Sequence, residues 1–286
     1  MKRHWEIPFT KFHGLGNDFV VVRAEALPSS LVKLSRAICQ RNTGVGADGL
    51  LVLAPARGKR INAELRFFNA DGSEAEMSGN GIRCAAAYLV LKNLASSPIR
   101  IRTVAGVKTL RVIKKERGRW LFRVAMGLPI LAPAKVPFKG AQGKKPVVGF
   151  PLRTEQGILP VTITSMGNPH CSILVRELSE FDWPKLGSEI EKMDLFPNRT
   201  NVEFVRVISK KEIEVRYWER GVGVTNSSGT GSCAATVAAI LNRRTGRKVR
   251  VRTLAGILHV SWPANGEVTL TGPAEIIAEG TYYFMP

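Results

Sequence analysis

The sequence lacks the features that mark a membrane protein, a secreted protein or a disulfide-rich domain. It has no run of about 18 apolar residues, so it offers no candidate transmembrane helix. The N-terminus, MKRHWEIPFT, has a basic start with no apolar stretch behind it, so we expect no secretory signal. Its four cysteines show no close-paired metal spacing, and four in 286 residues make no disulfide framework. These absences favour a cytoplasmic, reduced protein with no membrane partner.

Acidic residues are also scarce. Against 23 Asp and Glu stand 42 Lys and Arg, which gives a formal net charge of +19. Such a charge can mark nucleic-acid binding through phosphate contacts, or a solvated basic surface on a protein with another function. No aromatic residues are interleaved with the basic clusters as in an RNA-binding signature. We therefore expect no nucleic-acid partner, although the charge can attract an anionic substrate. The clusters lie beside Gly or Pro at 57–60, 114–119, 139–145 and 243–252.

The chain repeats itself at a constant offset of 150 residues. Between 78–106 and 228–256, ten of 29 positions are identical without a gap. Upstream, Phe67-Phe68-Asn69 falls on Tyr217-Trp218-Glu219 at the same offset. The repeat predicts two homologous domains, joined near residues 126–146, where Pro and Gly are frequent. Ligand sites favour such domain interfaces, so we expect a cleft between the two halves.

Each half has the same predicted order of strand, glycine turn, buried helix and strand. The runs before the glycine turn are short and apolar or alternating, as in strands. The stretches after it are Ala-rich, almost uniformly apolar and of helical length, which is typical of a buried helix. The predicted strands are Phe19–Arg23, Leu50–Leu53, Glu64–Phe68, Ile99–Thr103 and Val249–Thr253, and the predicted helices are Cys84–Leu91 and Cys233–Leu241.

A Gly-x-Gly turn stands directly ahead of each predicted helix, at Gly79-Asn80-Gly81 and Gly229-Thr230-Gly231. Glycine at a helix start leaves first-turn N–H groups free and lets a ligand approach closely. The positive ends of two such helices suit a carboxylate, especially one that takes up charge from a neighbouring carbanion. A hydroxyl side chain, Ser78 or Ser228, precedes each turn. The pattern predicts a functional site at these two helix starts.

Seven further motifs stand in the chain. They are Phe12-His13-Gly14-Leu15-Gly16-Asn17-Asp18-Phe19, Asn69-Ala70-Asp71-Gly72-Ser73-Glu74, Gly79-Asn80-Gly81-Ile82-Arg83-Cys84, Gly167-Asn168-Pro169-His170, Asn201-Val202-Glu203-Phe204, Trp218-Glu219-Arg220-Gly221-Val222-Gly223 and Thr271-Gly272-Pro273-Ala274. In order and spacing, from residue 9 to the C-terminus, these motifs resemble those of the diaminopimelate epimerase family.

The resemblance implies an α/β (α+β) fold of two pseudo-symmetric domains, each a curled β-sheet or barrel around a central helix. Residues 1–126 would form the N-terminal domain, completed by a C-terminal strand at 274–286, and residues 127–273 the second domain. A homodimer is also implied. The family inverts the stereocentre of an amino acid without pyridoxal phosphate or metal, so no cofactor is expected. The implied reaction interconverts LL- and meso-diaminopimelate, which supplies lysine or peptidoglycan precursors.

The site residues are carried over position by position from this resemblance. In the family, two cysteines act on opposite sides of the α-carbon, one as thiolate base and one as thiol acid. This sequence has Ser78 and Ser228 at those positions, and His170 and Glu219 match their respective partners. The residues matched to the reacting α-carboxylate are Gly79, Asn80, Gly229 and Thr230. Those matched to the far amino acid group are Asn17, Asn69, Asn168, Asn201, Glu219 and Arg220. Amides can bind both ammonium and carboxylate, Glu219 can pair with an ammonium, and Arg220 can bind a carboxylate bidentately.

Serine changes the expected chemistry. A thiol has a pKa of about 8.5, which a helix N-terminus lowers easily, whereas a serine hydroxyl needs an adjacent base. The remaining cysteines do not replace the missing thiols. Cys84 and Cys233 lie inside their predicted helices, where we expect them to pack in the core. Cys171, beside His170, is the one that could take a chemical role.

Four hypotheses follow from the serines. The protein could be a working isomerase in which His170 and Glu219 act as bases, directly or through the hydroxyls, on diaminopimelate or another amino acid. It could be an epimerase disabled by deliberate Cys→Ser changes, although Asn226 and Ser227 also differ from the family's usual small apolar residues. It could be a non-catalytic amino-acid-binding protein. It could be a nucleic-acid binder on an old enzyme fold. Retention of His170, Glu219 and Arg220 favours a site in chemical use.

Overall fold

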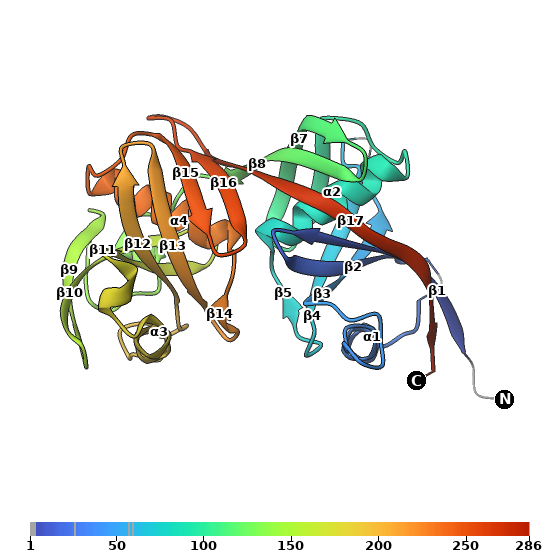
Figure 1. The fold of residues 1–286 in the computed structure, drawn as a ribbon, viewed down its shortest axis with the longest axis horizontal. Coiled ribbons are helices and arrows are strands. Elements are labelled where there is room, and N and C mark those ends of the chain that lie inside the picture. Colours follow the sequence, from blue (N-terminus) through green and yellow to red (C-terminus); the bar gives the residue numbers. More distant parts are fainter. Residues whose placement is uncertain (1–3, 26, 57, 59, 286) are drawn as a thin grey trace. The chain divides into compact units, whose positions relative to one another are not determined.

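A computed structural model describes residues 4–25, 27–56, 58 and 60–285 (Figure 1). Arg57 and Lys59 of the basic cluster at 57–60, and the first three residues of the N-terminal stretch, lie outside the described residues. The chain divides into two compact units. Unit 1 comprises Met1–Val124 with Gly272–Pro286, and unit 2 comprises Ala125–Thr271. Among the residues described, none of the helices has the length and apolar character needed to cross a bilayer.

Unit 1 is a closed ring of strands. The order around it is β1, β2, β3, β4, β6, β7, β8 and β17, and β17 pairs with both β8 and β1. Helix α2 runs inside the ring, and α1 packs against β3 and β4 outside it (Figure 1). The elements are β1 (Trp5–Gly14), β2 (Asn17–Arg23), α1 (Leu31–Ile38), β3 (Gly49–Pro55), β4 (Ala63–Asn69), β5 (Glu74–Ala75), α2 (Gly79–Leu91), β6 (Ile99–Thr103), β7 (Gly106–Glu116), β8 (Arg119–Gly127) and β17 (Val268–Phe284).

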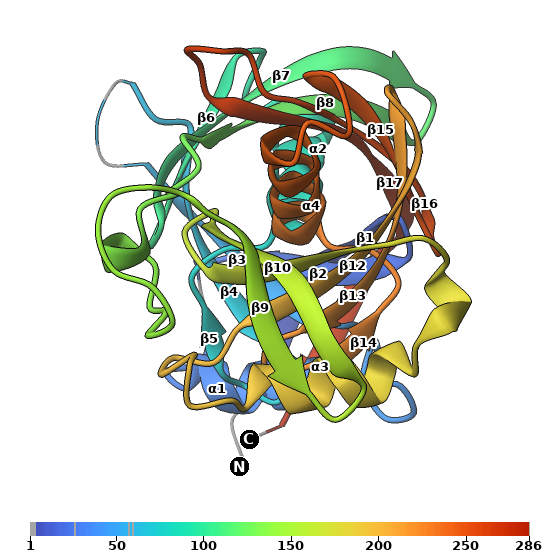
Figure 2. The ribbon, with the colours of Figure 1, turned by 90° about the vertical axis from the view of Figure 1, so that its left-hand side faces the viewer.

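Unit 2 has the same plan. Its strands follow the order β9, β10, β11, β12, β13, β15 and β16, and the start of β17 pairs with β16. Helix α4 lies inside the curl of these strands, and α3 packs on the outer face (Figure 2). The elements are η1 (Pro133–Lys135), β9 (Val147–Thr154), β10 (Gly157–Ser165), β11 (Pro169–Val175), η2 (Leu178–Glu180), α3 (Trp183–Glu191), β12 (Asn201–Ser209), β13 (Glu212–Glu219), β14 (Gly223–Thr225), α4 (Gly229–Leu241), β15 (Lys248–Thr253) and β16 (Gly256–Ser261).

The predicted fold class is confirmed, as a mixed α+β fold with few helices and curled sheets. The predicted strands and central helices are present, and α2 and α4 begin at Gly79 and Gly229, ahead of their predicted starts. The earlier start has a local cause, since Ser78 and Ser228 act as N-caps and so draw the glycines into the first turn. Both helices are buried along nearly their whole length, and their many alanines let the surrounding strands approach closely.

The region 126–146, predicted as a linker, carries some regular structure. Ile130 forms an isolated bridge with Ser165, and η1 follows at Pro133–Lys135. Both features belong to unit 2. The chain leaves unit 1 after Val124 and returns to it after Thr271.

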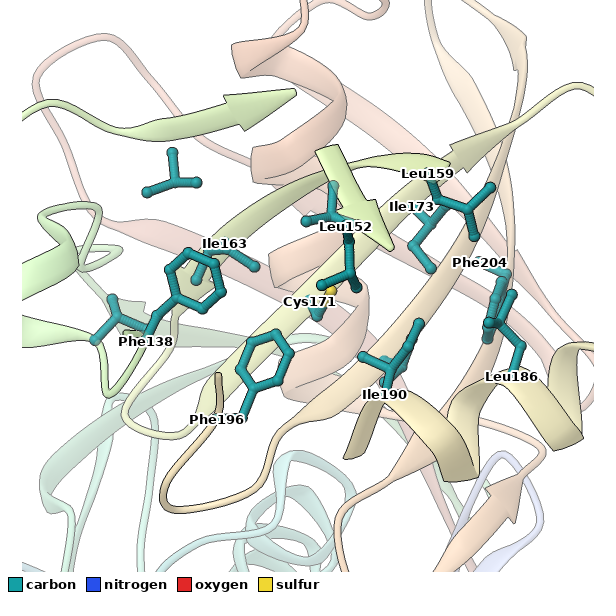
Figure 3. Close-up of a cluster of buried hydrophobic side chains, with 14 residues drawn as sticks. Phe138, Leu152, Leu159, Ile163, Cys171, Ile173, Leu186, Ile190, Phe196 and Phe204 are labelled. Atoms are coloured by element: carbon teal, nitrogen blue, oxygen red, sulfur yellow. The ribbon is translucent and has the colours of Figure 1, made fainter. Parts of the chain in front are cut away.

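The outer face of the unit 2 sheet carries an apolar core of its own. Leu186 and Ile190 of α3 lie beside strand residues that include Cys171 and Phe204 (Figure 3). These strand residues alternate with others whose side chains point to the opposite face, toward α4. The outward set explains the packing of α3, and the inward set carries the polar groups described next.

Candidate active site

In unit 1, the predicted site begins at Ser78, the N-cap of α2. Its hydroxyl oxygen accepts a hydrogen bond from the backbone N–H of Gly81 at 3.0 Å. Glycine is required at that position, because a Cβ on Gly81 would lie 2.9 Å from the ring of Phe67. Ser78 is only partly buried, so its hydroxyl stands at the open end of a buried helix.

Consecutive side-chain hydrogen bonds connect the start of α2 to residues of other elements. The buried Arg83 donates to the side-chain oxygen of Asn80 at 2.7 Å, and the Asn80 amide donates to Asn17 Oδ1 at 3.2 Å. Asn17 in turn donates to Asp48 Oδ2 at 2.8 Å. The bonds therefore fix the orientation of both amides. Asn69 is exposed and donates to Ser73 Oγ at 2.9 Å, so it is held by its own turn.

In unit 2, Ser228 caps α4 in the same way. Its oxygen accepts from the N–H of Gly231 at 3.2 Å, and its hydroxyl lies close enough to Glu219 to lower the pKa of that carboxyl group. Thr225 donates to Glu219 Oε1, at 2.8 Å. Burial of the carboxyl group raises the pKa of Glu219 above its ordinary value, against the lowering effects of the Thr225 hydrogen bond and of the nearby His170 and Ser228. The structure thus brings Ser228 and Glu219 together as a hydroxyl–carboxylate pair.

Two further side chains hold the Ser228 backbone in place through hydrogen bonds. The hydroxyl of Ser232 donates to the backbone carbonyl of Ser228 at 2.6 Å. Because that hydroxyl's hydrogen is used, the buried Tyr217 must donate to Ser232 Oγ, at 2.7 Å. Burial raises the pKa of Tyr217, so the phenol remains a donor. The cap of α4 is therefore tied to β13, the strand that carries Glu219.

His170 lies fully buried on β11, and both of its ring nitrogens have partners. Nδ1 lies 2.6 Å from Glu203 Oε1, and Nε2 lies 2.9 Å from Asn168 Oδ1. The other oxygen of Glu203 accepts from the hydroxyl of Ser172 at 2.9 Å. Glu203 and Ser172 were not among the residues predicted for the site. The alternation of Asn201 and Glu203 with the apolar Val202 and Phe204 was the available signal, since it places both polar side chains on one face of β12.

Both polar atoms of the Asn201 side chain, a predicted site residue, form hydrogen bonds. Its Nδ2 donates to the carbonyl of Pro169 at 2.8 Å, and its Oδ1 accepts from the backbone N–H of Arg220 at 3.0 Å. Arg220 itself is exposed and donates to the carbonyl of Asn198 at 3.1 Å. Glu191 of α3, also missed by the sequence analysis, accepts from the N–H of Gly221 at 3.0 Å. These bonds fix the turn that carries Glu219 and Arg220.

All four cysteines are buried. Cys84 and Cys233 are buried in the central helices, and burial raises the pKa of Cys84 to about 12. Cys171 is buried in the outer core beside α3, on the opposite face of β11 from His170, and burial raises its pKa well above the ordinary value. Cys171 therefore packs in the core and does not take the chemical role left open for it. Among the described residues, no group of three or more His, Cys, Asp or Glu is placed to hold a metal ion.

Several solved structures of the same fold are titled as an epimerase, a racemase or an isomerase. A hydroxyproline epimerase from Agrobacterium vitis matches with a TM-score of 0.73 at 16% identity, over 100% of this chain and 95% of that one. A methylitaconate-delta-isomerase matches with a TM-score of 0.66 at 16% identity, over 99% and 96%. At this identity the likeness shows the fold.

Sequence relatives define the family more narrowly. The model of the diaminopimelate epimerase family matches residues 9–131 and 162–277. A diaminopimelate epimerase from Pelotomaculum thermopropionicum is 44% identical over 278 residues, 96% of this chain and 98% of that protein. One from Bacillus cytotoxicus is 37% identical over 285 residues, 98% of each. The chain belongs to the diaminopimelate epimerase family.

Proposed function

We propose that the protein interconverts LL- and meso-diaminopimelate by removing the α-proton and returning one to the opposite side. The observation that carries this proposal is the Ser228–Glu219 pair at the start of α4, in a chain of this family. The proposed reaction needs neither pyridoxal phosphate nor a metal ion. We further propose that it runs in the cytoplasm, in a homodimer, and supplies lysine or peptidoglycan synthesis.

Glu219 is the proposed base of one half of the site. A carboxylate in water is a weak base, but burial raises the pKa of Glu219 and brings it closer to the working pH, where general bases are most effective. The Ser228 hydroxyl accepts from Gly231 and lies near Glu219, so in the proposed reaction it passes a proton to the carboxylate without ionising beforehand. Glu219 therefore acts directly or through Ser228.

Ser78 and His170 are the proposed second pair, as the family resemblance implies. The proton that leaves the α-carbon goes to one pair, the electron pair is delocalised into the α-carboxylate, and the other pair supplies the new proton. The N–H groups at Gly79, Asn80, Gly229 and Thr230 are proposed to hold that carboxylate, because a helix N-terminus stabilises growing negative charge. Asn17, Asn69, Asn168, Asn201, Glu219 and Arg220 are proposed to bind the far amino acid group.

Uptake of solvent deuterium at the α-carbons of LL- and meso-diaminopimelate, followed by proton NMR, tests the proposal. The parent protein is compared with the Ser78→Cys/Ser228→Cys variant and with Glu219→Gln. We expect exchange by the parent, faster exchange by the cysteine variant, and loss of exchange in Glu219→Gln.

Two other outcomes separate the alternatives. Exchange by the cysteine variant alone would mean a diaminopimelate site that lacks its acid–base pair, as in a binding protein or a disabled epimerase. Silence from both would point to a different amino acid or a different role, and would refute the proposed substrate.

A further inference from the structure

Three polar side chains form a buried group on the inner face of the unit 2 sheet. His170 and Ser172 lie on β11, Glu203 lies on β12, and each has at most 1% of its surface exposed. Ser172 and Glu203 are direct neighbours in the strand register. We call these three residues the buried triad.

Unit 1 contains an internal control for the triad, because its sheet has the same register. Tyr217 of β13 pairs with Glu203, and Phe67 of β4 pairs with Leu51. The repeat equates Tyr217 with Phe67, so Glu203 corresponds to Leu51. The glycine contacts agree with this equivalence, since a Cβ on Gly231 would meet the ring of Tyr217 as one on Gly81 would meet Phe67.

The remaining equivalences follow from the parallel pairs. Ser172 pairs with Glu203 as Val21 pairs with Leu51, and His170 precedes Ser172 by two residues as Phe19 precedes Val21. Unit 1 therefore fills the three positions with the apolar side chains of Phe19, Val21 and Leu51, all buried. The fold does not need polar groups there. Burying a carboxyl group and an imidazole is costly, so their presence in unit 2 calls for a functional reason.

The hydrogen bonds decide where His170 carries its protons. A carbonyl oxygen can only accept, so the ring nitrogen facing Asn168 Oδ1 must be an N–H. The proton between Nδ1 and Glu203 is shared by that pair. Ser172 holds the second oxygen of Glu203 and prevents the carboxyl group from turning away. His170 is thus arranged as a proton donor at Nε2.

We propose that Glu203 is a positioning residue for the acid–base chemistry, which keeps His170 protonated at Nε2 so that this nitrogen supplies the proton in one direction of the epimerisation. The inference rests on the proposed function. In that direction Glu219 gains the proton of the broken C–H bond, and His170 loses its Nε2 proton to the new C–H bond, directly or through a hydroxyl. The reverse reaction, or exchange with water, restores both groups.

The other titratable groups near the triad set the background for a pH profile. Glu219 and Tyr217 lie on β13, and Cys233 lies on α4. Burial raises the pKa of Glu219 and of Tyr217. A change in Glu203 should therefore leave the Glu219 limb of the profile in place.

Ring-nitrogen NMR gives a readout that does not depend on turnover. The chain has four histidines, so the His170 signals can be assigned with protein labelled at the imidazole nitrogens and a His170→Gln variant. We expect the parent to show a protonated Nε2. In Glu203→Gln we expect a mixture of tautomers. Glu203→Asp keeps the charge and should restore part of the parent signal.

Deuterium uptake at the α-carbon then measures the consequence. We expect Glu203→Gln to slow exchange about 100-fold, within the range for loss of general acid–base catalysis, with little change in KM. Ser172→Ala should have a smaller effect in the same direction. Glu214→Gln is the matched control, since Glu214 is a part-exposed carboxylate of the same sheet paired with Arg216, and its exchange rate should equal that of the parent.

The outcomes are distinct. Unchanged His170 signals in a folded Glu203→Gln variant, or altered signals with an unchanged exchange rate, would overturn the role of Glu203. Silence of the parent towards diaminopimelate would overturn the proposed function and the acid–base role together. An altered ring state with slowed exchange, both partly restored by Glu203→Asp, would support the proposal.

Discussion

The buried triad makes a prediction about stability that runs against the usual effect of core substitutions. We consider the variant His170→Leu/Ser172→Ala/Glu203→Leu, which replaces the whole polar group with apolar side chains, as unit 1 does with Phe19 and Leu51 at the corresponding positions. Leucine is used at 170 because Asn201 stands beside that position in unit 2, where unit 1 has Gly49. The variant removes the donors and acceptors together, and Asn168 is partly exposed, so water can replace its lost partner.

The expected magnitudes separate the triple variant from a single change. His170→Leu alone leaves the Glu203 carboxyl group buried without the imidazole 2.6 Å away, and breaking a buried pair in this way costs about 3–5 kcal/mol. Replacing a whole buried ionic group with apolar residues is instead neutral or stabilising, by about 1–4 kcal/mol. We therefore expect the triple variant to be at least as stable as the parent and to have lost α-proton exchange.

The assay must report on unit 2 by itself, because a chain with two units need not unfold in one step. Amide hydrogen exchange of α4 and of strands β10 to β13 gives that local measure, and thermal unfolding followed by circular dichroism supports it. If the triple variant were destabilised as strongly as His170→Leu, the fold itself would need the polar group. The functional interpretation of the triad would then be refuted.

Three further predictions concern the cap residues, the cysteines and Glu219. Since all four cysteines are buried, a thiol reagent should leave the native protein unlabelled, whereas Ser78→Cys should react readily at neutral pH, because a helix N-terminus lowers a thiol pKa. Gly231→Ala should destabilise unit 2 by about 1–3 kcal/mol in denaturant unfolding, since its Cβ would lie 2.9 Å from Tyr217. Because the pKa of Glu219 is raised in the folded state, its ionised carboxylate destabilises the folded protein at pH values above the unfolded carboxyl pKa of about 4.3. Unfolding measured across pH should therefore show Glu219→Gln gaining stability over the parent as pH rises to neutral, with the gain lost in acid.

The sequence was enough to predict the architecture, because the repeat carries strong local signals. Two Ala-rich runs behind Gly-x-Gly turns predict two buried helices, and apolar runs around them predict the strands. The cap geometry was less accessible. Only the structure shows that the Ser78 and Ser228 oxygens accept from the N–H groups at Gly81 and Gly231.

The buried triad could not be predicted from the repeat. The sequence offset between the halves changes from strand to strand, so a comparison at constant offset does not place Glu203 on Leu51 or His170 on Phe19. Strand register is set by hydrogen bonding between segments far apart in the chain, and the sequence gives no direct measure of it. Asn201 shows a related limit, since whether an amide meets a ligand or braces two loops depends on which groups the fold places beside it.

Serine at a helix start has a consequence for the direction of proton movement. A hydroxyl has one hydrogen, and at Ser228 the oxygen accepts from the N–H of Gly231 while the Glu219 carboxyl group lies nearby. The cap thus orients the hydroxyl, and replacing such a cap by alanine typically costs about 0.5–2 kcal/mol of stability. A thiolate would bring its own negative charge to the reaction, whereas this serine depends on the carboxylate behind it. Under the proposed mechanism, the basicity lost with the thiols has to come from the groups behind the serines. These are the partly buried Glu219 in one pair and the buried His170, held by Glu203, in the other.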